Sequence, residues 1–269
     1  MKFINSTLSY FFKNFVAIAL FSLPAAVFFA LKYNSTSFYL YLLNLGNLET
    51  SSFIKIYSNF TLFPSFNILI ILLWALVLIL SFCLLFSYIE RHMKYGIKSY
   101  LKSFKSINYC ILVVSPAFFT VLAFEEIFAV LNSLFIKLIS LSILSIKGVL
   151  MTMMFALLII ILFLIYSLIA LWVPIKMVTG YSHRDAIRYS IRLSQGHQLR
   201  LMLGLLFPFV VTAPLMMLLK NYSHIEVLNS VVYGLCYIFI IGFLAAFAMT
   251  AYFAISGTER KDIKRKIFR

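Results

Sequence analysis

Long apolar runs separated by short polar connections dominate the chain. Each of the longest runs has at least about 18 residues, enough for a helix to cross a hydrocarbon core of about 30 Å. The pattern predicts six membrane-spanning helices, at Asn14–Leu31, Ser65–Ile89, Asn108–Val130, Val149–Val173, Leu199–Leu219 and Leu228–Ile255. We therefore expect an all-α polytopic membrane protein, with residues 1–269 forming a single integral membrane domain.

One polar connection, Ser182 to Gly196, has the pattern of a short amphipathic helix. Ser182 followed by Asp185 is a capping-box arrangement, and Gly196 suits the left-handed position after a helix. Positively charged residues recur every four positions and form one stripe: Arg184, Arg188 and Arg192. A different, mostly apolar face holds Ile187, Ser190, Ile191 and Ser194. This pattern is typical of a helix that lies on a membrane surface.

Composition and charge support a membrane protein and give it an orientation. The chain is 63% hydrophobic, whereas soluble domains average about 45–50%. A net charge of +15 would suggest a nucleic-acid partner in a soluble protein. Here 18 of the 23 Lys and Arg residues fall on one side of the predicted helices. The positive-inside rule accounts for this bias, places both termini in the cytoplasm, and leaves no need for nucleic acid.

Prolines indicate an internal repeat. Pro24, Pro116 and Pro208 are spaced 92 residues apart, and each lies about nine residues inside a helix predicted to run outward. At about 1.5 Å per residue they reach roughly the middle of the bilayer, where proline kinks a helix. The alternative is that prolines in apolar helices align by chance.

Basic residues repeat with a similar period. Lys94, Lys98 and Lys102 have the spacing of the arginine stripe, 90 residues earlier. The predicted unit is a cytoplasmic amphipathic segment followed by a kinked outward helix and a returning helix. Three such hairpins would form parallel repeats around an axis normal to the membrane. They cover residues 1–90, 91–181 and 182–256, and a basic tail follows at 257–269.

Short motifs in these connections resemble a known family. The run Leu171-Trp-Val-Pro-Ile-Lys is followed by Ala-x-x-x-Ser-x-x-Leu-x-x-Gly, from Ala186 to Gly196. Together with Tyr10-Phe-Phe-Lys-Asn-Phe, these motifs resemble six-helix bacterial inner-membrane proteins of the YciC type. The membrane domain of some glycerophosphodiester phosphodiesterases is a further relative of this pattern. The resemblance implies a six-helix fold, a bacterial inner-membrane location and a lipid- or envelope-related role, and it carries over no catalytic residue.

Acidic residues within the apolar runs are the other candidates. Glu125 and Glu126 lie in the outer half of the third predicted helix, where ionisable groups are costly and often functional. They either bind a proton or cation inside the membrane or mark the water-facing end of the helix. Glu90-Arg91-His92, at the cytoplasmic end of the second helix, is explained by local pairing and snorkelling. No motif of a catalytic, metal or cofactor site occurs.

These observations lead to two functional hypotheses. The first is a non-enzymatic protein of lipid or envelope homeostasis, which binds anionic lipid or a membrane-protein partner at its cytoplasmic face. The candidate lipid contacts are Lys94, Lys98, Lys102, Arg184, Arg188 and Arg192, which would otherwise only fix the topology. The second is a transporter or permease with a path between the hairpins, in which Glu125 or Glu126 binds a cation or proton.

Overall fold

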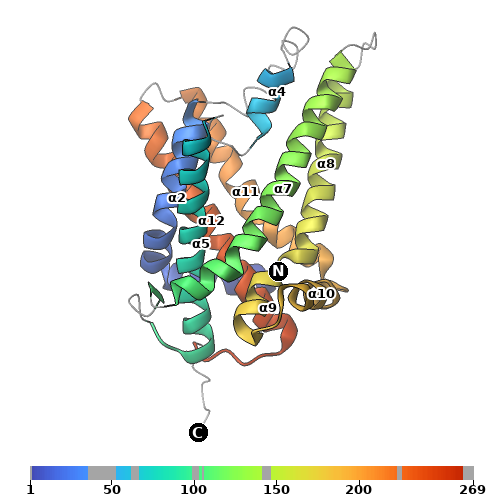
Figure 1. The fold of residues 1–269 in the computed structure, drawn as a ribbon. Helices are drawn as coiled ribbons and strands as arrows, with labels where there is room; N and C mark the ends of the chain where they lie inside the picture. The colour runs from blue at the N-terminus through green and yellow to red at the C-terminus, as the bar shows by residue number, and fades with distance from the viewer. Residues whose placement is uncertain are drawn as a thin grey trace.

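The fold is helical throughout the part of the chain that the computed structural model describes, residues 2–35, 53–61, 67–98, 103–104, 106–140, 147–222 and 226–262. The helices in chain order are α1 (Lys2–Lys13), α2 (Phe15–Ser35), α4 (Phe53–Phe60), α5 (Ile68–Tyr95), α7 (Ile107–Ser140), α8 (Lys147–Ile169), α9 (Trp172–Thr179), α10 (His183–Ser194), α11 (Gln198–Tyr222) and α12 (Glu226–Ser256). Figure 1 shows the long helices side by side, with α9 and α10 at one end of the bundle and α4 at the other.

Five helical segments are long and apolar enough to cross a membrane. They are Ile68–Tyr95, Ile107–Ile139, Val149–Thr179, Gln198–Met216 and Leu228–Ser256. A sixth candidate is a pair, Phe3–Lys13 and Phe15–Ala30, which pass only together and are bent by 91°. The structure thus supports a multi-pass membrane protein with five candidate spans, and the first predicted span falls within the bent pair.

Three predicted helix ends differ most from the structure. The second predicted helix ends at Ile89, but α5 continues to Tyr95. The third ends at Val130, but α7 continues to Ser140, and α7 packs against α4. The fourth is predicted to run through to Val173, but α8 ends at Ile169 and α9 starts at Trp172. Pro174 explains this break, because proline has no N–H for the carbonyl four residues earlier and disfavours a continuous helix there.

The long helices pack in chain order, and α12 closes the arrangement by packing against α2. α12 also contacts α1, α5 and α11, so it is the central helix of the core. Small side chains on α12 permit this, since Ala245, Ala246 and Ala251 are all buried. Small residues let helix backbones approach closely, which is how helices commonly associate inside membranes.

Both described ends of the chain lie at the end of the bundle that carries α9 and α10, which we call the basic end. The ring of Phe3 in α1 contacts the ring of His197, just before α11. Beyond α12, Arg260 donates to the hydroxyl of Ser6 at 3.1 Å. The amide of Lys261 donates to the carbonyl of Met93 at 2.8 Å. The chain ends therefore meet over the end of α5, and the membrane side on which they lie stays a prediction.

The three prolines occupy similar places in continuous helices. Pro24 and Pro116 are each the tenth residue of their helix, counted from Phe15 and Ile107. Pro208 is the eleventh residue of α11, counted from Gln198. The threefold repeat and the kinks stay predictions that agree with this placement.

Lys94 and Lys98 do not lie on one helix as the members of the arginine stripe do. α5 ends at Tyr95, because Gly96 adopts a left-handed φ of 73° and its amide bonds back to the carbonyl of His92. Lys94 therefore lies on α5, Lys98 follows its end, and Lys102 is outside the described residues. Equal spacing of the lysines and arginines does not give equal structure here, and Gly96 is the reason.

Candidate functional site

The predicted helix between Ser182 and Gly196 is confirmed as α10. The Ser182 hydroxyl accepts a hydrogen bond from the Asp185 amide at 3.2 Å and donates one to its carboxylate. At the other end Gly196 has a φ of 82°, a conformation that glycine adopts without strain. Local capping chemistry thus determines both ends of the helix.

One face of α10 is fixed to the bundle by hydroxyl groups. Ala186, Ser190 and Ser194 are buried. The Ser190 and Ser194 hydroxyls lie 2.7 and 3.5 Å from the carbonyl of Leu168, at the end of α8. The last carbonyls of a helix lack partners within it, so these hydroxyls satisfy a group that α8 leaves free. Of the predicted mostly apolar face, the two serines are thus turned toward the bundle, Ile187 is half-buried and Ile191 is 37% exposed.

The opposite face of α10 carries the arginine stripe. Arg184, Arg188 and Arg192 are all exposed. None of them forms a hydrogen bond or an ion pair with the part of the chain that the structure describes. Two exposed tyrosines, Tyr181 and Tyr189, lie edge to face beside the stripe. The stripe is therefore free to contact an anionic surface outside the protein.

His183 fixes the start of α10 to α7. Its Nε2–H donates to the carbonyl of Leu112 at 3.1 Å. That carbonyl lacks its usual helical partner, because the residue four positions later is Pro116, which has no N–H. The Nδ1 atom of His183 is buried and has no hydrogen-bond partner. Burial, helped by the positive charge of Lys176, lowers the pKa of His183, although the Leu112 carbonyl partly offsets this.

We expect acid to weaken this contact. Since the pKa of His183 in the folded protein lies below its ordinary 6.5, the unfolded chain binds the proton more readily. The contribution of His183 is complete above about pH 6.5 and falls as the pH decreases toward the folded-state pKa. His183→Gln keeps an amide donor but does not titrate. The thermal midpoint of the wild type should drop more between pH 7 and pH 5 than that of the variant, and equal drops would contradict this assignment.

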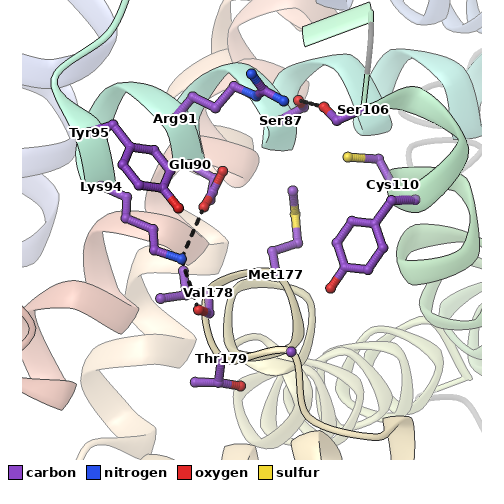
Figure 2. A pocket seen from close by; sticks show the side chains of 12 residues that line it. Ser87, Glu90, Arg91, Lys94, Tyr95, Ser106, Cys110, Met177, Val178 and Thr179 are labelled. Carbon is purple, nitrogen blue, oxygen red and sulfur yellow. Dashed lines mark hydrogen bonds and ion pairs between the residues drawn. The ribbon is translucent and has the colours of Figure 1, made fainter. Parts of the chain in front are cut away.

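Beside α10, a cleft of about 490 Å³ opens at the basic end. It is formed by the end of α5, the start of α7 and the end of α9 with the turn that follows (Figure 2). The lining residues are Ser87, Glu90, Arg91, Lys94, Tyr95, Ser106, Tyr109, Cys110, Met177, Val178, Thr179 and Gly180. The cleft thus combines cationic, hydroxyl and apolar side chains from three helices far apart in sequence.

Most polar groups of the cleft are engaged in holding these helices together. The Lys94 ammonium donates to the carbonyl of Val178 at 3.1 Å and lies 3.7 Å from the Glu90 carboxylate. A cation at the end of α9 is favourable, because helix C-termini carry free carbonyls and partial negative charge. The Ser87 and Ser106 hydroxyls are hydrogen bonded at 2.7 Å, which joins α5 to the residue before α7.

Arg91 is the exception among these groups. Its side chain is half-buried and lines the cleft, as Figure 2 shows. It forms no hydrogen bond or ion pair with any residue that the structure describes. Within Glu90-Arg91-His92, the close contact of Glu90 is with Lys94 and His92 is bonded to Tyr10, so the charge of Arg91 acts on Glu90 only from a longer distance. Arg91 presents a guanidinium whose donors have no acceptor in the described protein.

Glu125 and Glu126 do not mark the end of α7. Both are half-buried, and α7 continues beyond them to Ser140. The Tyr166 hydroxyl of α8 donates to Glu125 at 2.7 Å. In α4, the Tyr57 hydroxyl donates to Glu126 at 2.6 Å, and burial raises the pKa of Tyr57. The two carboxylates thus hold α8 and α4 to the middle of α7, and the interpretation that they mark the end of the helix is wrong. That they bind a proton or cation inside the membrane stays a prediction.

Comparison of the chain with protein-family models, with curated proteins and with solved structures found no match. The resemblance to YciC-type proteins therefore stays a prediction that rests on the short motifs alone.

Proposed function

We propose that this protein binds anionic lipid at its basic end, as a non-enzymatic inner-membrane protein of bacterial lipid or envelope homeostasis. In this proposal six helices span the membrane as three hairpins, and the basic end faces the cytoplasm. The observation that carries the proposal is the arginine stripe, which is exposed and has no ion pair with the described residues, on a helix whose other face is fixed to the bundle.

The stripe has the charge and the neighbours that surface binding requires. A basic residue close to an anionic leaflet contributes about 1 kcal/mol, so Arg184, Arg188 and Arg192 together contribute about 3 kcal/mol. Tyr181 and Tyr189 lie in contact beside them, and tyrosine is enriched at the level of lipid headgroups. Since Ser190 and His183 fix α10 to α8 and α7, binding does not have to order the helix first.

Neutralising the stripe is the direct test. We expect Arg184→Gln/Arg188→Gln/Arg192→Gln to weaken the binding of anionic lipid to the reconstituted protein by about tenfold or more at low salt. The difference should shrink as ionic strength rises, because salt screens exposed charges. Binding would be measured as the anionic lipid retained per protein after reconstitution into mixed bilayers and detergent extraction.

A matched control removes the same charge from the opposite side. Lys137→Gln/Lys147→Gln/Lys220→Gln changes lysines that the charge pattern predicts to lie outside, and it should leave anionic-lipid retention unchanged. Equal retention by the stripe variant and the wild type would refute the proposed function.

A further inference from the structure

We propose that the cleft between α5, α7 and α9 is a binding site for a phosphodiester anion and that Arg91 is its principal ligand. The inference rests on the proposed function, since it names the headgroup class that the basic end selects. The cleft involves residues other than the arginine stripe, so the inference can be refuted while the proposed function stands.

The first argument is the unused bonding capacity of Arg91. A guanidinium has five N–H donors in a planar fork that matches two oxygens of a phosphate group. Arg91 is half-buried in the cleft, yet no described residue accepts a hydrogen bond from it. Because the side chain is only partly solvated, an anion that bonds its free N–H donors is favourable there, and hydrogen bonds between charged groups are the strong ones. An oxyanion in the cleft supplies this missing partner.

The second argument is the charge of the site, which distinguishes between classes of phosphate. Arg91 and Lys94 contribute two formal positive charges and Glu90 one negative charge, so the cleft carries one net positive charge. A phosphodiester has one negative charge and neutralises it. A phosphomonoester carries nearly two at neutral pH, and its second charge would lie close to Glu90, whose side chain is only 12% exposed. Repulsion at short range therefore favours the diester.

The third argument is the shape and polarity of the surroundings. Figure 2 shows Met177 of α9 in the middle of the cleft, with Glu90 and Lys94 of α5 on one side of it and Cys110 of α7 on the other. A cleft of about 490 Å³ falls within the usual size of small-ligand sites. From the cleft, Tyr109 and Leu112 follow one face of α7 and are 46% and 69% exposed. A diester bound at Arg91 can therefore direct an apolar tail along the outer surface of α7.

The site is tested with the full chain in detergent and soluble probes. Dihexanoyl phosphatidylglycerol is a lipid diester, dihexanoyl phosphatidic acid is the corresponding monoester, and glycerophosphoglycerol is the diester without acyl chains. We expect the lipid diester to bind more tightly than the monoester at pH 8, and Arg91→Gln to weaken its binding at least tenfold in calorimetric titration. Arg91→Lys, which keeps the charge but loses the planar fork, should lose part of this affinity.

Lys13→Gln is the matched control, because it removes an exposed charge on the same predicted side of the membrane but outside the cleft. It should leave the affinity unchanged. Glycerophosphoglycerol, the probe without acyl chains, shows whether the natural ligand is a lipid. If it binds more weakly than dihexanoyl phosphatidylglycerol, the site recognises a lipid headgroup. If the two bind equally, the ligand is a free diester. Unchanged binding by Arg91→Gln, or tighter binding of the monoester, would overturn the site.

Loss of folding does not confuse this test, since Arg91 bonds to no described residue and its replacement should leave the thermal midpoint unchanged. If the stripe variant retains less anionic lipid but Arg91→Gln binds the soluble diester normally, the proposed function stands and the cleft is not the binding site. If Arg91→Gln weakens diester binding but the stripe variant retains as much anionic lipid as the wild type, the cleft stands as a diester site and the stripe is not a lipid contact.

Discussion

Replacing Gly242 by alanine is expected to lower the stability of the bundle by roughly 1–3 kcal/mol, the usual cost of overpacking a core. A Cβ atom at this position would lie 2.3 Å from Cγ2 of Ile18 and 3.0 Å from Cε2 of Phe11. Neither neighbour can move away easily, because both side chains are fully buried in the main core. The added methyl group would therefore push α12 away from α1 and α2.

Gly234 supplies the control in the same helix. A Cβ atom there would meet nothing within 4 Å, and alanine favours a helix by up to about 1 kcal/mol over glycine. Gly234→Ala should therefore keep or raise the thermal midpoint in detergent, whereas Gly242→Ala should lower it. Equal midpoints for the two variants would contradict the close approach of α12 to α2.

The parts of the fold that depend on neighbours in sequence could be predicted from the sequence. α10 is the clearest case, because Ser182, Asp185 and Gly196 determine its ends through local hydrogen bonds and backbone conformation. The five candidate spans follow from the length of their apolar runs. The failure of the lysine stripe had a local signal as well, since a glycine two residues after Lys94 favours a helix end.

The cleft and the role of the acidic pair could not be predicted in this way. Arg91 looks like any interfacial arginine until α9 meets α5, because only that contact forms the cleft that Arg91 lines. Glu126 likewise depends on α4, an eight-residue helix in the connection between the first and second predicted spans. Contacts between segments dozens of residues apart leave no trace in the periodicity of either segment.

Pro116 has a role in the structure beyond the helix kink that the sequence predicts. The sequence marks it as a possible kink, but the structure shows that its missing N–H leaves the Leu112 carbonyl free for His183. The proline therefore also sets where α10 attaches to α7. Since Ser190 attaches the same helix to α8, the direction of the arginine stripe is determined by two independent contacts.

The segment after α12 is held at the basic end by a buried ion pair. Arg260 donates from Nε and Nη2 to the two carboxylate oxygens of Asp262, at 3.1 and 2.7 Å. The side chains are only 12% and 5% exposed. Arg260 also bonds to Ser6 and lies over the ring of Tyr10, 5.7 Å from its centre. The pair therefore connects the end of the described chain to α1.

Asp262→Asn is expected to destabilise this region by about 3 kcal/mol, because breaking a buried pair leaves one charge without compensation. Arg260→Met/Asp262→Leu removes both charges and should recover most of that loss. Lys261→Gln is the control, since its side chain is exposed and its amide, not its ammonium, bonds to Met93. Thermal midpoints and the rate of proteolysis after α12 would measure the effect. If Asp262→Asn behaved like Lys261→Gln, or the double variant were less stable than the single one, the ion pair would not be what holds this segment to α1.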